Sequence, residues 1–390
     1  MKIKRAEVYL LEIPFRKSFS HATSSRSKTG NLITKLTLEN GIVGFGEGVP
    51  REYVTGENCV SSETVLSNFF IPVIRDVEFR SFEDCVRFLD DIREFRAGEV
   101  IFNSAKCSLE LAVLDAFGKH FRRNISDVID ILKIERFSLT KKQKFSYVFS
   151  LDKEINWSLN KVLYAYGFRD FKFKIDSRRD YSQIEKFSKS IKDKISSFDV
   201  WLRADANGSL NESELDSVIN ELSKREVYYL EQPVARGKEK HLRSFKYQYI
   251  IMLDESLLNI EDAKRAIEEG YGDMFNIRVS KNGGIIPALR IIELARKNEI
   301  LYQIGCMVGE SGILSAVGRH FATMVPEALF YEGSYGKHLL KEDITKENMA
   351  FGFGAEVNPK KNPLGDFGLG INIDEKRLSR YSKKIKTIEL

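Results

Sequence analysis

The sequence predicts an α/β protein built around a TIM-type (β/α) barrel, with a smaller α+β unit beside it. Its 390 residues suit a barrel of roughly 250 residues and a second domain. From about residue 145 an apolar, β-type run recurs roughly every 25 residues, and each run is followed by a helical pattern. The preceding segment has strand patterns first and helical patterns afterwards, which is typical of an α+β unit. The predicted boundaries are 1–122 for this unit, 123–350 for the barrel and 351–390 for a C-terminal tail.

The α+β unit begins with strand patterns at residues 3–13 and 31–46. The turn residues Glu39-Asn40-Gly41 divide the second pattern, which predicts a hairpin. Between the two patterns, the polar segment 18–30 is expected to form a flexible loop. Apolar residues at helical spacing, the second set after a Ser81 cap, then predict three helices. These residues are Val65, Phe69 and Phe70; Val86, Leu89, Ile92 and Phe95; and Ala105, Leu109, Ala112, Val113 and Phe117.

Eight apolar runs form the barrel pattern, and eight βα units close a TIM barrel. Barrel strands are buried on both faces, so continuous apolar runs are expected in place of alternation. The runs are residues 145–150, 171–176, 200–205, 227–231, 249–254, 274–279, 300–304 and 328–332. After Phe351 the chain is rich in Gly, Pro and Lys, and we expect this tail to return to the N-terminal unit.

Composition and charge exclude several classes of protein. Charged residues make up 30% and apolar residues 43% of the chain, as in an ordinary globular protein. The net charge of +5 comes from 61 basic and 56 acidic residues mixed along the chain, which argues against a nucleic-acid partner. We see no bilayer-length apolar run, no signal-peptide pattern and no Cys-x-x-Cys motif. We therefore expect a soluble, cytoplasmic protein with a small-molecule substrate and no membrane partner.

Charged residues stand at the carboxyl ends of five successive runs, where TIM barrels carry their active sites. Lys172 and Lys174 alternate with apolar residues, so both side chains point to the same face of their strand. Two neighbouring ammonium groups repel each other, which requires a nearby anion or the loss of one proton. Three carboxylates and another lysine follow at later strand ends: Asp205, Glu231, Asp254 and Lys281. One such residue alone is more often a solvated charge or an ion pair, whereas six together indicate an active site.

Three carboxylates that converge at a barrel mouth are suitable ligands for Mg²⁺. No histidine or cysteine joins them, which favours a hard cation over zinc. Such a site stabilises the enediolate that forms when a proton is removed α to a carboxylate. The metal and Lys172 both favour the neutral amine of Lys174, which is therefore a candidate base, while Lys172 stays charged beside the substrate carboxylate. Lys281, on the opposite wall, would return a proton to the other face and invert the stereocentre.

The motifs at these strand ends resemble those of the muconate lactonizing enzyme subgroup of the enolase superfamily, over nearly the whole chain. They are Phe171-Lys172-Phe173-Lys174, Asp205-Ala206-Asn207, Glu231-Gln232-Pro233, Asp254-Glu255-Ser256 and Lys281-Asn282-Gly283-Gly284. The resemblance implies a lysine base with Mg²⁺, which is known for this superfamily. It also implies that the N-terminal unit and the tail form a capping domain over the barrel mouth. Gly44-Phe45-Gly46-Glu47-Gly48 and Val54-Thr55-Gly56 are most similar to dipeptide epimerases, especially those acting on L-Ala-D/L-Glu.

The resemblance further implies which residues surround the substrate, since loops 18–30 and 51–57 would shape the pocket. The candidates for substrate binding are Arg26, Arg51, Tyr53, Thr55 and Glu332. Glu332 stands where these epimerases typically carry Asp-x-Asp for the amino terminus of the dipeptide. Three polar residues are expected beside the ligands: Asn207, Glu255 and Glu310. For Glu310, an acid favoured by a helix dipole is an equally good explanation.

The main hypothesis is a Mg²⁺-dependent dipeptide epimerase, an isomerase that works by 1,1-proton transfer between two lysines. A muconate cycloisomerase, an o-succinylbenzoate synthase or an N-acylamino acid racemase would use the same fold and residues. From other classes, a Schiff-base aldolase using Lys174 and a non-catalytic binding protein stay open. The three carboxylates argue against the first, and the intact set of site residues argues against the second. The resemblance also leads us to expect a homo-oligomer.

Overall fold

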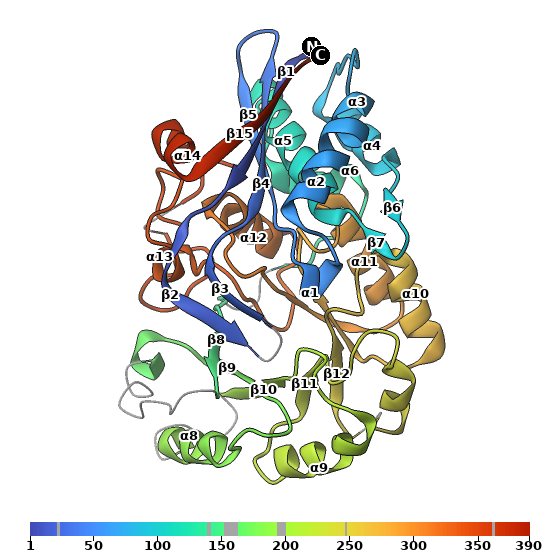
Figure 1. The fold of residues 1–390 in the computed structure, drawn as a ribbon, viewed down its shortest axis with the longest axis vertical. Coiled ribbons are helices and arrows are strands. Elements are labelled where there is room, and N and C mark those ends of the chain that lie inside the picture. Colours follow the sequence, from blue (N-terminus) through green and yellow to red (C-terminus); the bar gives the residue numbers. More distant parts are fainter. Residues whose placement is uncertain (22–23, 139–141, 152–162, 193–199, 246–247, 361–362) are drawn as a thin grey trace.

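The computed structural model describes residues 1–21, 24–138, 142–151, 163–192, 200–245, 248–360 and 363–390. Its two main sheets lie in different parts of the molecule (Figure 1). One is antiparallel with the order β15-β1-β4-β5, and the other is parallel with the order β14-β13-β12-β11-β10-β9-β8. The antiparallel sheet contains both ends of the chain, and the parallel sheet carries the strand ends on which the candidate site residues stand.

The predicted hairpin is formed by β4 (Asn31–Leu38) and β5 (Val43–Gly48). Strand β5 packs closely against the long, largely buried helix α5 (Asn103–Phe121). Three glycines of β5 make this approach possible, because a Cβ at any of them would collide with the helix backbone. These glycines are Gly44, Gly46 and Gly48. The contact between β5 and α5 therefore forms the centre of the capping domain.

The segment 18–30, expected to be a flexible loop, contains most of an antiparallel hairpin. Its strands are β2 (Pro14–His21) and β3 (Ser24–Lys28). The expectation was wrong because a polar surface strand is held by backbone hydrogen bonds to its neighbour, which leave no apolar pattern in the sequence.

The three predicted helices exist, with altered bounds. Helix α4 (Phe82–Asp91) begins after the predicted cap Ser81 but ends before Ile92, whose backbone is extended. The first predicted helix is divided into three consecutive short helical segments. The third predicted helix is α5. The helices and short strands of this part are α1 (Glu52–Thr55), α2 (Cys59–Val65), the π-helical η1 (Leu66–Phe70), α3 (Ile71–Val73), β6 (Arg96–Ala97), β7 (Val100–Ile101), η2 (Ile125–Asp127) and α6 (Val128–Ile131).

Seven strands form the parallel sheet, and the eighth predicted run closes it. The strands are β8 (Tyr147–Ser150), β9 (Asp170–Lys174), β10 (Trp201–Asp205), β11 (Tyr229–Glu231), β12 (Ile250–Leu253), β13 (Met274–Ile277) and β14 (Leu301–Ile304). In the eighth run, Tyr331 forms bridges to both Ile304 and Phe145, on the two edges of the sheet. Glu332 N donates to Ile304 O over 2.8 Å, and Ser146 N donates to Tyr331 O over 2.7 Å. These bonds complete a closed barrel.

Helices follow the barrel strands in the predicted alternation from β9 onward, whereas most of the segment after β8, residues 152–162, lies outside the described residues. They are α8 (Ser182–Lys192), α9 (Glu212–Ser223), the 3-10 segment η3 (Glu239–Phe245), α10 (Ile260–Glu269), α11 (Ile285–Lys297), α12 (Gly312–Met324) and the short α13 (Gly336–Leu339). Because strand and helix alternate, the carboxyl ends of all strands open toward one end of the barrel.

The C-terminal tail returns to the N-terminal unit. After α14 (Glu375–Tyr381), strand β15 (Ser382–Glu389) pairs antiparallel with β1 (Ile3–Leu11), so the two ends of the chain lie side by side (Figure 1). The predicted fold class, a barrel with a capping domain built from both ends of the chain, is confirmed. Within the described residues, no helix is long and apolar enough to cross a membrane.

Candidate active site

Three carboxylates lie together where the central barrel strands end. Asp205 and Glu231 end β10 and β11 and are paired in register across these strands. Asp254 follows β12 directly. Each of the three residues is at most 1% exposed, so each negative charge needs a partner inside the protein.

Lys172 and Lys174 of β9 both reach the carboxylate of Asp205. Lys174 Nζ donates to Asp205 Oδ2 over 2.5 Å and to Asn207 Oδ1 over 2.9 Å. Lys172 Nζ lies 3.4 Å from the same Asp205 oxygen and 2.8 Å from Glu231 Oε2. Burial would lower the pKa of Lys172, but the surrounding carboxylates, Glu231 foremost, outweigh burial and raise it. Lys172 is therefore held in its charged form.

Lys281 approaches the carboxylates from the other side, in the loop after β13. Its Nζ donates to Asp254 O over 2.7 Å, to Asp254 Oδ1 over 3.0 Å and to Asn276 O over 2.8 Å. Burial lowers the pKa of this amine, and the charge of Asp254 opposes the shift. In the order of the sheet, β9 and β13 flank β10, β11 and β12. Lys174 and Lys281 consequently face the acidic cluster from opposite sides.

The capping domain holds the Lys281 loop in place. Asn103, the first residue of α5, donates to Lys281 O over 2.7 Å and to Leu258 O over 2.9 Å. Val49 N, directly after β5, donates to Ser280 Oγ over 2.7 Å. Since both donors belong to the capping domain, its docking positions the backbone that carries the Lys281 amine.

Arg278, directly after β13, is a site residue that the sequence analysis missed. Its guanidinium forms an ion pair with Asp254 and lies 3.4 Å from Glu231 Oε1. Asn276 Nδ2 donates to the same Glu231 oxygen over 2.7 Å. Burial would raise the pKa of the Glu231 carboxyl, but Lys172 and Arg278 outweigh burial and lower it. The strand-end rule used for the other site residues also applies to Arg278, and it was the signal that could have found it.

The donor set of this cluster suits a hard divalent cation, because it consists of carboxylates. Glu255 Oε2 is buried beside the cluster without a hydrogen-bond partner. Burial, together with the charges of Asp254 and Asp205, raises the pKa of Glu255 to about 8, which favours the neutral form of this carboxyl at pH 7. Among the described residues, no three His, Cys, Asp or Glu side chains stand at metal-site spacing. The carboxylates are paired with Lys172 and Arg278 in this structure.

Glu332, the expected partner of a substrate amine, is ion-paired inside the barrel. Lys172 Nζ lies 2.7 Å from Glu332 Oε1, and an Arg203 guanidinium nitrogen lies 3.2 Å from the same oxygen. Arg203 also pairs with Asp170 over 2.6 Å. Arg203 and Asp170 were not among the predicted site residues, because they lie within strands and not at their carboxyl ends. Two cations therefore already compensate the charge of Glu332.

The three polar residues expected beside the ligands lie close to the cluster or its cavity. Asn207 N donates to Asp205 Oδ1 over 2.9 Å, and Asn207 Nδ2 donates to Glu255 Oε1 over 3.3 Å. Glu310 Oε1 accepts a bond from Met307 N over 2.7 Å. Burial raises the pKa of Glu310 to about 8. This carboxyl therefore accepts a hydrogen bond from the backbone of the loop after β14, and it is largely neutral at pH 7.

The four substrate-binding candidates in the capping domain are absent from the described lining of the barrel cavity. The Arg51 guanidinium is fully buried and donates to Val308 O over 2.6 Å, and Thr55 Oγ1 donates to Arg51 O over 3.3 Å. The Arg51 side chain thus joins the capping domain to the loop after β14, whereas the Thr55 bond stays within the capping domain, and neither residue lines the cavity. Burial and the nearby charge of Arg26 lower the pKa of Arg51 to about 10. Neither Arg26 nor Tyr53 lines the cavity, and their contact with substrate stays a prediction.

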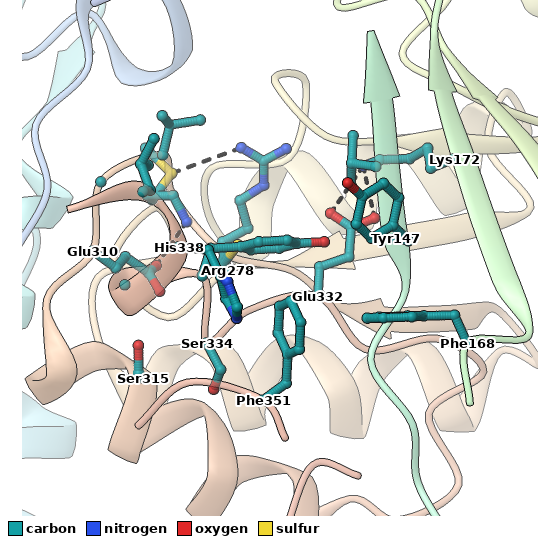
Figure 2. A pocket seen from close by; sticks show the side chains of 18 of the residues that line it. Tyr147, Phe168, Lys172, Arg278, Glu310, Ser315, Glu332, Ser334, His338 and Phe351 are labelled. Carbon is teal, nitrogen blue, oxygen red and sulfur yellow. Dashed lines mark hydrogen bonds and ion pairs between the residues drawn. The ribbon is translucent and has the colours of Figure 1, made fainter. Parts of the chain in front are cut away.

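A cavity of about 510 Å³ opens beside the lysines, within the roughly 300–1,000 Å³ of ordinary ligand pockets. Its charged and acidic lining residues are Lys172, Lys174, Arg278, Glu310 and Glu332. Figure 2 shows Lys172 and Glu332 meeting there. The rest is lined mainly by rings, from Tyr147, Tyr166, Phe168, Tyr335, His338 and Phe351.

The fold and the site together define a barrel enzyme with acids and amines gathered at its strand ends, under a capping domain. Residues 157–377, more than half of the chain, match the family described as enolase C-terminal domain-like, and the chain belongs to this family.

Characterised relatives include racemases and epimerases. The chain is 27% identical, over 83% of its length, to N-succinyl-L-Arg/Lys racemase of Bacillus cereus, of which 84% is covered. It is 30% identical, over 80% of its length, to L-Ala-D/L-Glu epimerase of Francisella tularensis subsp. novicida, of which 85% is covered. These relatives confirm the predictions of the enolase superfamily and of an isomerase of the racemase and epimerase class.

A solved structure supports the fold over the whole chain. The dipeptide epimerase of Cytophaga hutchinsonii, complexed with Mg and the dipeptide D-Ala-L-Val, matches with a TM-score of 0.81 at 22% identity and covers 100% of both chains. At this identity the likeness establishes the fold alone. Sites of the enolase superfamily use a lysine or histidine base together with Mg²⁺.

Proposed function

We propose that this protein is a Mg²⁺-dependent dipeptide epimerase, which moves a proton between the two faces of the carbon next to a carboxylate. One observation carries the proposal: the amines of Lys174 and Lys281 contact the acidic cluster from opposite sides. Two amines on opposite faces of one carbon can remove a proton from one face and add a proton to the other. Relatives named as dipeptide epimerases support the substrate class.

The acidic end of the cavity provides for the substrate carboxylate. Mg²⁺ held by Asp205, Glu231 and Asp254 would neutralise the negative charge that develops on this carboxylate as the proton leaves. Lys172, which stays protonated between Glu231 and Glu332, would donate a hydrogen bond to the same group. Because Lys172 is fixed by two carboxylates, it is oriented before the substrate arrives.

The two remaining lysines exchange the proton. Lys174 in its neutral form takes the α-proton from one face, and protonated Lys281 gives a proton to the other. For the opposite epimer the roles are reversed. The Lys281 side chain is fully buried, whereas that of Lys174 is 15% exposed. A proton carried by Lys281 is therefore the better shielded from solvent.

The test follows the exchange of each α-proton in D₂O with Mg²⁺. We expect the wild type to incorporate deuterium at the α-carbon from both epimers of an accepted dipeptide. Lys174→Ala and Lys281→Ala should each lose epimerisation by about 10²–10⁴-fold, and each should retain exchange for one epimer only, the opposite one in the two variants. Lys189→Ala, at a 75% exposed lysine of α8, is the matched control. Absence of exchange with every dipeptide would refute the proposal.

A second candidate is a racemase of N-acylated amino acids. Glu332 favours it, because Lys172 and Arg203 already compensate its charge, and an acylated amine needs no carboxylate partner. The same exchange assay with N-succinyl amino acids distinguishes the two candidates.

A further inference from the structure

We propose that the substrate carries a large apolar or aromatic group, remote from its reactive carboxylate, which binds against an aromatic wall of the cavity. The inference rests on the proposed function, since it takes the lysine-bearing end of the cavity as the reactive end. The proposed apolar group is the part of the substrate that the reacting lysines do not contact.

The aromatic wall consists of Tyr147, Phe168, Phe351 and His338 (Figure 2). Ring centroids are 5.3 Å apart for Tyr147 and Phe168 and also for Phe168 and Phe351, both pairs in T-shaped contact. His338 stacks on Phe351 with 4.4 Å between centroids. Edge-to-face and stacked contacts of this kind stabilise aromatic clusters. The wall is therefore packed into a defined surface without a ligand.

The wall is mainly apolar, and its polar atoms are the Tyr147 hydroxyl and the ring nitrogens of His338. Burial lowers the pKa of His338 below its ordinary value, so its ring is neutral at pH 7. The half-buried Leu339 and the buried Leu163 line the cavity as well. A ligand group that replaces water on this surface gains by removing apolar area from solvent.

The cations of the described lining come from the ends of barrel strands β9 and β13. In the described part of the lining they are Lys172, Lys174 and Arg278, and each is paired with strand-end carboxylates. A second carboxylate that lies against the rings of the wall would consequently lack a cationic partner among the described lining residues. A remote ammonium would also lack a partner, because Glu332 is compensated by Lys172 and Arg203. Burying an unpaired charge is unfavourable in either case.

Glu310 is the further acid in the described lining, and it does not alter this conclusion. Its carboxyl bonds to Met307 N over 2.7 Å, and burial raises its pKa to about 8. In its neutral form it offers a hydrogen bond to a carbonyl group, such as an amide of the substrate, and no charge.

The experiment compares two dipeptide series, L-Ala-L-Xaa and L-Xaa-L-Ala, with Phe, Leu, Glu or Lys as Xaa. Binding is measured by calorimetry with Mg²⁺, and kcat/KM by deuterium exchange. In at least one series we expect the Phe or Leu compound to exceed the Glu and Lys compounds about tenfold or more in both measurements, equivalent to about 1.4 kcal/mol. Equal or tighter binding of the Glu or Lys compounds in both series would overturn the inference. If the apolar compounds bind more tightly but show no deuterium exchange, binding of an apolar group at the aromatic wall would be supported and the proposed epimerase activity would be refuted.

Two variants test the wall itself. Phe351→Ala should lower kcat/KM for the Phe compound about tenfold and leave L-Ala-L-Ala nearly unchanged. Phe353→Ala, two residues further on and 78% exposed, is the matched control. Leu339→Arg adds a cation to the apolar lining, and it should shift the preference toward the Glu compound, which loss of folding cannot produce. If folded Leu339→Arg protein still prefers the Phe compound as strongly as the wild type, the remote group binds elsewhere and the inference is wrong.

Discussion

Asn103 Nδ2 lies 2.7 Å from the backbone carbonyl oxygen of Lys281, although the two residues belong to the capping domain and the barrel. The same amide donates to Leu258 O over 2.9 Å, and Asn103 is only 2% exposed. One capping-domain side chain thus joins the loop after β12 to the loop that carries the Lys281 amine. Under the proposed mechanism, Asn103 is a positioning residue for proton transfer at one face of the substrate.

We expect Asn103→Ala to slow proton transfer at the Lys281 face about tenfold or more, because a small displacement of a reacting group is costly. Exchange of the epimer that uses Lys281 as base should fall relative to exchange of the other epimer. Asn298→Ala, which removes an exposed side-chain bond to Leu294 O, is the control. An equal loss for both epimers would show that Asn103 has a structural role only.

Removal of divalent metal should abolish exchange, and Mg²⁺ should restore it. Mg²⁺ should also raise the Tm of the protein, because an ion that binds only the folded state stabilises it. Asp205→Asn should weaken both effects, with a loss of metal affinity of about 100-fold. Asp91→Asn, at an exposed position of α4, is the control. Calorimetric titration and thermal unfolding measure these effects independently of activity, and an unchanged Tm shift in Asp205→Asn would contradict the assignment of this ligand.

Glu110 should make stability depend on pH. Its carboxylate accepts bonds from Ile285 N over 2.5 Å and Ile286 N over 3.1 Å, at the start of α11. Burial raises its pKa from 4.5 to about 7. A raised carboxyl pKa means that the folded state holds the proton more tightly, so this contribution to stability is complete below pH 4.5 and is lost as pH rises to about 7.

Glu110→Gln removes this titration. The variant should therefore gain stability relative to the wild type between pH 4.5 and 7, by up to about 3 kcal/mol. Urea unfolding at several pH values measures the difference. Glu268→Gln, at an exposed position of α10, should show no such trend. A difference between Glu110→Gln and the wild type that is constant with pH would contradict the expectation.

Gly46→Ala should destabilise the capping domain by about 3 kcal/mol or more, as an overpacked core position does. The added Cβ would collide with Ser108 O of α5. Gly318→Ala is the matched control, because its Cβ would meet nothing within 4 Å on α12, and it should stabilise the protein by about 0.5–1 kcal/mol. Denaturant unfolding compares both variants, and a neutral Gly46→Ala would refute the close packing of β5 on α5.

The sequence was sufficient to predict which residues stand at the ends of the barrel strands. It was not sufficient to predict which charged side chains pair with each other. Asp205, Glu231 and Asp254 could be placed at one end of the barrel because apolar runs and their boundaries are visible in a single chain. The pairing of Glu332 with Lys172 and Arg203 involves side chains from three strands. Such a pairing depends on the distances between the side chains in the folded barrel.

The sequence by itself determined the barrel, the capping domain and the gathering of lysines and acids at the barrel mouth. Periodicity, turn residues and residue type are local properties, and they are sufficient for these features. Only the tertiary structure decided that Arg51 is buried between the capping domain and the loop after β14, that Asn103 holds the Lys281 loop and that Tyr147 and Phe351 belong to one aromatic wall. Each of these depends on packing between segments that are distant in the chain, and a local pattern does not contain that information.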